Sequence, residues 1–358
     1  MKIKDFMDYE QPNEYIVESD RYSSKYSTPV LTAGQSFILG YTNESKGIYE
    51  KGPCIIFDDF TTSVHYVDFP FKVKSSAMKI LTTKSYADLK YCYYLLLSLS
   101  KIPPNHKRQW ISTTSEKTHV LPSMDKQISI VKQLDLISDT IANYTNQIEN
   151  LDNLVKARFI EMFGDAVDNP MRWEKRKLQD IVTDDCTISY GIVQTGNDQE
   201  DGVPVFRPVD IVNKVPKLTE LKKTTEEISN KYKRTILKGR ELLITVRANI
   251  ADTCIVDEEF KGCNVGRGIV PIRTQENIMV LEFLKYLLDS KHLNDDIKSK
   301  AKGITLIQLN MEDLREVELI YPPIEKQMDF VEFAEQVDKS RFDIKKSIIE
   351  LEREVVYD

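Results

Sequence analysis

The residues that could carry out chemistry in this chain do not fall into the spacings of known catalytic or metal sites. Its four histidines form no His-Glu-x-x-His pair, and its five cysteines include no Cys-x-x-Cys pair. A Gly-x-x-x-x-Gly-Lys-Ser/Thr phosphate loop is missing, and the Gly-x-Gly at 266–268 leads into a predicted strand. The acidic pair Asp58-Asp59 follows a predicted strand and is favoured as a turn over a metal site. We therefore expect no catalytic centre, no metal site and reduced cysteines.

Basic side chains are concentrated in two stretches of a chain that is acidic as a whole. The net charge of −7 argues at first sight against a nucleic-acid ligand. Between 231 and 247, however, the basic residues face a single acid, Glu241, and between 72 and 108 a single acid, Asp88. Clustered cations displace counterions from a duplex, and this pattern leaves DNA contact and a solvated charged surface equally open.

Candidate DNA contacts are basic, aromatic and polar side chains in these stretches and in neighbouring turns. Arginine and the amides are included because they make bidentate contacts to base edges. In the first half of the chain the candidates are Gln35, Thr61, Thr62, His65 and Lys74. In the second half they are Tyr190, Gln194, Lys231, Lys233, Arg234, Arg247, Asn249 and Arg267.

Two long segments with heptad spacing are expected to position these candidates. Apolar residues alternate three and four positions apart from Asp125 to about Phe163, and the pattern returns from Glu325 to Val355, interrupted only at Arg341. We expect two helices that pair antiparallel as a coiled coil and set the distance between two globular domains. The alternative is that they only bury each other or pair between molecules. The predicted seam consists of Ile130, Leu134, Ile137, Ile141, Tyr144, Ile148, Leu151, Val337, Arg341, Ile344, Ile348 and Leu351.

The helical segments belong to a longer internal repeat. Pro122–Gln127 aligns without a gap on Pro322–Gln327, and the opening Lys2–Phe6 resembles Lys177–Ile181. Each half also holds strand and helix candidates, which are Cys54–Phe57, Val73–Leu81 and Tyr86–Leu99 in the first, and Val203–Arg207, Leu242–Arg247, Cys254–Val256, Ile269–Ile272 and Val280–Ser290 in the second.

The expected fold is α+β, with two mixed α/β domains, two long helices and a pseudo-twofold internal repeat. The predicted parts are a first domain at 1–121, a helix at 122–165, a second domain at 166–321 and a helix at 322–358.

At the level of motifs the chain resembles a known family over its whole length. The second half carries Ile188–Gln194, Gly202–Arg207, Leu237–Ile244 and Ala301–Thr305, and it closes with Pro322–Gln327. These motifs are similar to those of the specificity (S) subunits of type I restriction-modification systems. The first half, with its motifs at 29–34 and 57–61, resembles another branch of the target recognition domains of that family.

The resemblance implies a non-catalytic subunit that reads double-stranded DNA. Each domain would read one half of a bipartite, asymmetric target, and the helices would fix the gap and dock two methyltransferase (modification) subunits. A motor-nuclease (restriction) subunit would join them. The resemblance implies no cofactor in this chain, with S-adenosylmethionine, ATP and Mg²⁺ expected on the partner subunits.

Two alternative functions are compatible with the sequence. A coiled-coil scaffold that does not read DNA, and a restriction or modification enzyme with a cryptic active site, are the alternative functions. No apolar run reaches the ~18 residues of a membrane span, and the start of the chain has no signal-peptide pattern. We therefore expect a cytoplasmic protein without a membrane partner.

Overall fold

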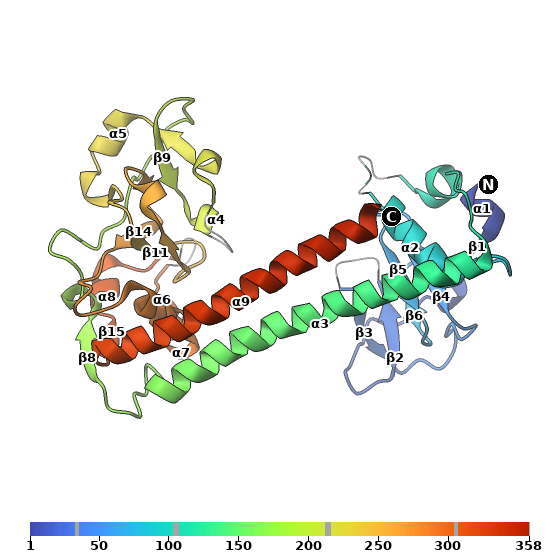
Figure 1. Cartoon of the computed structure of the whole chain (residues 1–358), viewed down its shortest axis with the longest axis horizontal. Coiled ribbons are helices and arrows are strands. Elements are labelled where there is room, and N and C mark those ends of the chain that lie inside the picture. Colours follow the sequence, from blue (N-terminus) through green and yellow to red (C-terminus); the bar gives the residue numbers. More distant parts are fainter. Residues whose placement is uncertain (33–35, 102, 104–106, 212–215, 304–306, 358) are drawn as a thin grey trace. The chain divides into compact units, whose positions relative to one another are not determined.

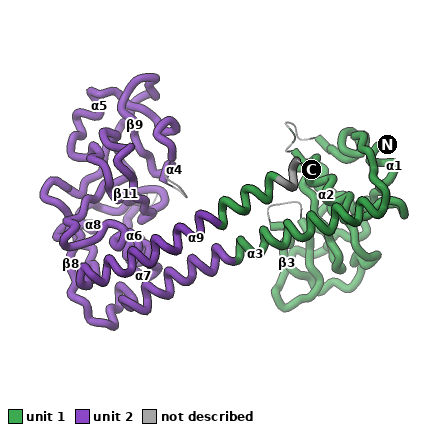
Figure 2. Tube along the Cα trace, in the orientation of Figure 1, with its two compact units in different colours: residues 1–146, 344–358 green, residues 147–343 purple. Residues whose placement is uncertain are grey.

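Two compact units make up the chain. The computed structural model divides into residues 1–146 with 344–358 and residues 147–343 (Figure 1, Figure 2). The long helices α3 (Met124–Phe163) and α9 (Ile324–Tyr357) contribute to both units. The structure describes residues 1–32, 36–101, 103, 107–211, 216–303 and 307–357.

The first unit is organised around a four-stranded antiparallel sheet with the order β1-β7-β4-β5. A smaller sheet has the order β3-β2-β6. Trp110 is buried at the start of a π-helical turn and packs on Phe57, with ring centroids 5.2 Å apart. The elements are α1 (Ile3–Phe6), β1 (Met7–Glu10), β2 (Thr28–Leu31), β3 (Ile38–Thr42), β4 (Cys54–Asp58), β5 (Val64–Val67), β6 (Lys72–Val73), β7 (Met78–Thr83), α2 (Leu89–Leu99) and the turn Trp110–Thr114.

The second unit contains two three-stranded sheets, β12-β11-β14 and β10-β9-β13, and the pair β15-β8. Its helices α6 and α7 continue from one to the next around Ser290. The elements are β8 (Glu174–Lys177), β9 (Val203–Phe206), α4 (Pro208–Ile211), β10 (Lys222–Thr224), α5 (Glu226–Asn230), β11 (Glu241–Thr245), β12 (Thr253–Val256), β13 (Asn264–Val265), β14 (Ile269–Ile272), α6 (Leu281–Asp289), α7 (Lys291–Ser299), α8 (Met311–Arg315) and β15 (Glu318–Tyr321).

The strand topology of the second unit repeats that of the first. Strand β4 lies between β7 and β5, and β11 lies in the same way between β14 and β12, with all four pairings antiparallel. In the smaller sheets, β2 has one antiparallel and one parallel neighbour, and so has β9. The α+β fold with an internal repeat is therefore confirmed, and the four-part division of the chain stays a prediction.

A buried glutamine joins helix α3 to the sheet domain of the first unit. Gln127 is fully buried, although it lies on a helix whose neighbouring residues are exposed. Its Oε1 accepts a 2.7 Å hydrogen bond from the backbone N–H of Asp88, the N-cap residue of α2. Its Nε2 donates to the carbonyl oxygens of Tyr86 (3.2 Å) and Pro122 (2.8 Å). One side chain thus ties the start of α2 to the start of α3.

The second unit contains the same device at the position 200 residues later. Gln327 is fully buried, and its Oε1 accepts a 3.0 Å bond from the N–H of Val280, the N-cap residue of α6. Its Nε2 donates to the carbonyl oxygens of Ile278 (3.1 Å) and Pro322 (2.8 Å). The aligned hexapeptides therefore end on a glutamine because both copies need one amide that accepts and donates at once.

Within the second unit the long helices run antiparallel. Phe159 and Phe163, near the end of α3, pack edge-on against Phe330, near the start of α9, with centroids 5.4 and 5.7 Å apart. Further along, Asp152 of α3 pairs with Arg341 of α9. Every predicted seam residue is buried or half-buried. The predicted register agrees with this burial and stays a prediction.

Arg341 has a specific role where the heptad pattern predicts only an irregularity. Its guanidinium pairs with Asp152 and lies 3.5 Å from an oxygen of Asp338, one turn earlier on α9. The arginine side chain is 31% exposed. It therefore faces the seam and places an ion pair across it.

One strand prediction is wrong, and the cysteine prediction holds. Val73–Leu81 is two strands, because β6 ends at Val73 and pairs with β2, whereas β7 begins at Met78 and pairs with β1 and β4. All five cysteines are free and buried. Burial raises the pKa of Cys54 and of Cys92 to about 12, which keeps these thiols protonated.

Candidate nucleic-acid interface

Three of the predicted contact residues come together in the second unit. Arg247 follows β11 and is half-buried, while Arg267 lies exposed in the turn between β13 and β14. The guanidinium carbon of Arg267 lies 5.9 Å from the ring centroid of Tyr190, which is 39% exposed. Burial, together with the positive charge of Arg267, lowers the pKa of Arg247. The two arginines therefore form a local concentration of positive charge beside an exposed aromatic ring.

Neither arginine of this cluster is neutralised by a carboxylate among the residues that the structure describes. Arg207, Arg240 and Arg273 of the same unit all pair with carboxylates. Among the residues that the structure describes, no carboxylate lies within ion-pair distance of Arg247 or Arg267. Uncompensated arginines next to each other repel, and an anion between them removes that repulsion. The cluster is consequently suited to a phosphate or to the acceptor atoms of a base edge.

Arg247 is oriented by a neutral amide. Its Nη2 donates a hydrogen bond to Oε1 of Gln308. The backbone of Gln308 exchanges two hydrogen bonds with Lys302 (2.9 and 3.0 Å), and the next N–H, of Leu309, donates to the carbonyl of Val246 at 3.0 Å. These bonds hold Gln308 beside Arg247 and leave the charge of the guanidinium intact.

A close backbone approach brings Tyr190 to Arg267. A Cβ atom at Gly191 would lie only 1.8 Å from the carbonyl oxygen of Val265, so this position requires glycine. The next residue, Ile192, donates its N–H to the same carbonyl at 2.8 Å. The loop that carries Tyr190 is therefore fastened directly to the strand that leads into the Arg267 turn.

Backbone strain accompanies the site on both sides. Ile188, two residues before Tyr190, has a φ of +40°, and Ala248, directly after Arg247, has a φ of +60°. Such angles cost about 1–3 kcal/mol for non-glycine residues and are concentrated at functional sites. Arg315 of α8 holds the first of them by donating to the carbonyl of Ile188 at 2.9 Å.

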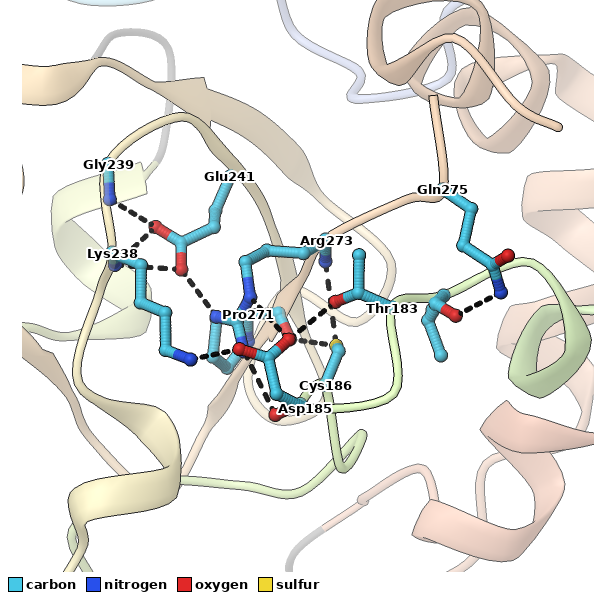
Figure 3. Close-up of polar contacts among 10 residues, drawn as sticks. Thr183, Asp185, Cys186, Lys238, Gly239, Glu241, Pro271, Arg273 and Gln275 are labelled. Atoms are coloured by element: carbon cyan, nitrogen blue, oxygen red, sulfur yellow. Dashed lines mark hydrogen bonds and ion pairs between the residues drawn. The ribbon is translucent and has the colours of Figure 1, made fainter. Parts of the chain in front are cut away.

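An ionic network around the buried Glu241 fixes the segment that precedes Tyr190 (Figure 3). Glu241 is fully buried, and it accepts hydrogen bonds from the N–H groups of Lys238 and Gly239 and from Arg273 at 2.6 Å. Arg273 also donates to the carbonyl of Asp185 at 3.0 Å, and the Asp185 carboxylate pairs with Lys238. The segment that continues to Tyr190 is thus fixed to the start of β11 and the end of β14.

The basic stretch after α5 is anchored but remains on the surface. Lys231 pairs with Glu227 at 2.9 Å, one turn away, so part of its charge is compensated. Lys233 and Arg234 are exposed. Buried Asn264 of β13 accepts from the Thr235 hydroxyl at 2.8 Å and so fastens this stretch to the smaller sheet.

The remaining candidates of the second unit lie in exposed turns. Asn249 is in the turn between β11 and β12 that begins at Arg247, and Gln194 follows the Tyr190 loop. Asn249 therefore shares a short turn with Arg247. For Gln194 the structure shows exposure alone.

In the first unit, most of the candidate side chains contact other residues of the same unit. Thr62 is buried, and its hydroxyl donates to the carbonyl of Lys101 at 3.0 Å, so it does not face a ligand. His65 stacks on Phe37 with centroids 3.9 Å apart, and burial lowers the pKa of this histidine. Lys74 pairs with Asp20.

Thr61 and the acidic pair before it form a turn, as the sequence indicates. The Thr61 hydroxyl donates to Asp58 at 2.5 Å. Asp59 pairs with buried Lys79 at 2.9 Å and accepts from the N–H of Trp110 at 2.8 Å. Gln35 lies outside the described residues.

One group of possible metal ligands lies at the end of α3. Oxygen or nitrogen atoms of Asp165, Asp168 and His292 lie within 4.8 Å of one another. Asp165 accepts from the N–H groups of Val167 (2.9 Å) and Asp168 (3.0 Å), and it lies 2.5 Å from Nδ1 of His292. The carboxylate thus stabilises a turn and pairs with the imidazole.

Comparison with known proteins shows the family. A family model described as the type I restriction modification DNA specificity domain matches residues 170–353, just over half of the chain. The type I restriction enzyme EcoR124I/EcoR124II specificity subunit of Escherichia coli is 30% identical over 345 residues, which cover 92% of this chain and 84% of that protein. This chain belongs to the type I restriction-modification specificity subunits. The E. coli EcoBI specificity subunit is 23% identical and covers 87% of this chain and 72% of its own length.

Solved structures of specificity subunits share the fold. The S subunit from M. genitalium has a TM-score of 0.58 at 14% identity, over 99% of this chain and 93% of that chain. A chain from a structure of complex assembly and conformational transition of the type I R-M system has a TM-score of 0.53 at 17% identity, over 98% and 94%.

Membership of this family makes the chain a DNA sequence-specificity subunit without catalytic activity of its own. The methylase and nuclease activities reside in other subunits, with which specificity subunits assemble. In the part of the chain that the structure describes, no helix combines the length and apolarity that a bilayer requires.

Two side chains that support this candidate interface, Gln308 and Arg315, are not among the residues that the sequence predicts. Gln308 is a single amide in a loop, and Arg315 lies on a short helix, so neither has a local pattern. The internal repeat points to Gln308, because the first unit has a backbone hydrogen bond at the matching place. The N–H of Gln109 donates to the carbonyl of Asp59 at 2.8 Å, as that of Leu309 does to Val246. Exposed Arg108 therefore occupies in the first unit the position that Gln308 occupies in the second.

Proposed function

We propose that the two units of this specificity subunit read the two halves of a bipartite, asymmetric DNA target. In the second unit, the reading surface is the cluster of Tyr190, Arg247 and Arg267, with Asn249 in the adjoining turn. The observation that carries this proposal is the pair of neighbouring arginines, which have no carboxylate partner in the described part of the chain. Lys233 and Arg234 supply further phosphate contacts.

In the first unit the reading surface is the turn between β4 and β5, together with the neighbouring Arg108. Phe60 follows Asp59 here as Arg247 follows Val246 in the second unit. Because the same backbone frame presents different side chains, the two half-sites differ in sequence. Thr61 is the predicted contact of this turn, and His65 and Lys74 contribute once their contacts to Phe37 and Asp20 open.

The long helices keep the two reading surfaces at a fixed spacing and dock two modification subunits. Support comes from the glutamines Gln127 and Gln327, which fasten each sheet domain to the start of a long helix. The modification subunits bind S-adenosylmethionine, and a motor-nuclease subunit with ATP and Mg²⁺ completes the complex in the cytoplasm. The specificity subunit itself carries no cofactor in this proposal.

Mapping of methylated adenines tests the proposal. Co-expression with the cognate modification subunits, followed by methylome sequencing, is expected to give one motif of two different half-sites separated by a constant gap. Methylation without a sequence motif, or a continuous motif, would contradict it. Duplex binding whose affinity does not fall with added salt would contradict the use of the arginine cluster.

Insertion of one heptad into each long helix tests the spacing. Copies of residues 140–146 and 344–350 are placed after 146 and after 343, where the two units divide. Seven residues extend a helix by about 10 Å, which is about three base pairs. The gap is expected to lengthen by about that amount with both half-sites kept, and an unchanged gap would refute the spacing role. Four-residue insertions, which put the seam out of phase, are the control and should abolish methylation.

A further inference from the structure

Arg247 differs from the other cations of the second reading surface in how it is held. It is half-buried, and its Nη2 is fixed by the neutral Gln308. Arg267, Lys233 and Arg234 are exposed. Phosphate neutralisation needs only a charge near the backbone, whereas base reading needs a side chain held in one orientation.

The bond to Gln308 leaves a defined set of donors. Arginine has five N–H groups in one plane, and one of them is used by the Gln308 oxygen. The remaining N–H groups of the two terminal nitrogens and Nε form a fork that requires two acceptors side by side. In the major groove, guanine presents such a pair at O6 and N7, while adenine presents a donor next to its N7.

We propose that Arg247 reads a guanine in the second half-site and that Gln308 is its positioning residue. The neighbouring Arg267 neutralises a backbone phosphate beside Tyr190. A carboxylate in place of Gln308 would also orient the guanidinium, but it would cancel the charge that attracts DNA. The neutral amide orients without that cost. This inference rests on the proposed function, because it specifies one contact of the second reading surface.

The experiment uses the full chain with its modification subunits and a duplex that carries the mapped target. Each guanine of the second half-site is replaced in turn by 7-deazaguanine, which keeps base pairing and lacks the N7 acceptor. At one position, we expect affinity to fall on the order of tenfold. Arg247→Ala should cause a loss of similar or greater size on the normal duplex, and 7-deazaguanine at that position should cause no further loss of affinity in the Arg247→Ala complex. Arg267→Ala should cause a loss that multiplies with the 7-deazaguanine effect.

Gln308→Ala separates positioning from general stability. We expect the methylated motif to become degenerate at the same single position, with the rest of the second half-site and the whole first half-site unchanged. The first half-site serves as an internal control for folding, and Gln308→Glu should weaken binding more than Gln308→Ala. Lys298→Ala, which removes an exposed charge on α7, is the matched control and should leave the motif unchanged.

Three results would overturn the inference. The first is a second half-site without guanine. The second is that the losses from Arg247→Ala and from 7-deazaguanine multiply at every guanine. The third is that Arg247→Ala weakens binding equally for all sequences, as loss of a phosphate contact does. These results leave the proposed bipartite reading intact. A wild-type complex without any sequence preference would instead contradict the proposed function itself.

Discussion

Replacement of Gln327 by methionine is expected to destabilise the second unit strongly. Methionine keeps the volume of the side chain and removes all three hydrogen bonds, so no cavity term enters. Three bonds at about 1 kcal/mol each, with the Val280 N–H and two carbonyls left without this partner, give a loss of about 2–4 kcal/mol. With a urea m-value of about 2 kcal/mol/M, the unfolding midpoint should fall by about 1–2 M.

Urea unfolding followed by circular dichroism measures this shift in the intact chain. Gln127→Met should lower the transition of the first unit by a similar amount, because Gln127 makes the same three contacts. Gln336→Met, at an exposed position of α9, is the control and should change the midpoint by less than about 0.2 M. If Gln327→Met behaves like this control, the glutamine does not fasten the domain to the helix, and the account of both copies fails.

Three further perturbations test other contacts. Lys79→Met should cost about 3–5 kcal/mol of unfolding free energy, because it leaves Asp59 buried without its ion-pair partner; a loss below 1 kcal/mol in urea unfolding would refute this. A double-mutant cycle of Arg341→Leu and Asp152→Asn should give a coupling of up to about 1 kcal/mol, since both side chains are partly exposed; zero coupling would contradict the register. The pKa of Asp185 is lowered, chiefly by a hydrogen bond from its lysine partner, so its stabilisation is present above the unfolded pKa of about 3.9 and is lost as pH falls further. When the unfolding free energies of wild type and Asp185→Asn are compared as pH is lowered, their difference should disappear over that range. A difference that stays constant with pH would contradict the role of the Asp185 carboxylate.

The sequence predicts the frame of the molecule better than its reading surface. The heptads are periodic over many residues, so the two long helices follow from local pattern. The strand predicted at Val73–Leu81 fails because the chain changes sheets there, a choice made by pairing partners far away in sequence. Likewise, the pairing of Lys74 depends on Asp20, at a distance of 54 positions that no local pattern reveals.

Residue type selects Arg247 and Arg267 as candidates, but it does not predict that they converge. Arg247 follows β11 and Arg267 lies in the turn between β13 and β14. Tyr190 reaches Arg267 because Gly191 packs on the backbone of Val265. Thr62 shows the opposite case. Its polarity suggested a surface contact, yet the hydroxyl is needed inside the first unit. A single sequence does not distinguish a polar group that satisfies the fold from one that faces a ligand.

The repeat shows how one backbone frame carries different side chains in the two units. Gln127 and Gln327 make the same bonds in the two units because the attachment of sheet to helix allows one geometry. At the reading surface, only backbone bonds recur, from Gln109 to Asp59 and from Leu309 to Val246, while the adjoining side chains differ. Backbone bonds do not depend on side-chain identity. The side chains at these positions can therefore change without loss of the backbone frame. Replacement of Arg247 and Gln308 by the residues at the matching positions of the first unit, Phe60 and Arg108, should alter the second half-site and leave the gap between the half-sites unchanged.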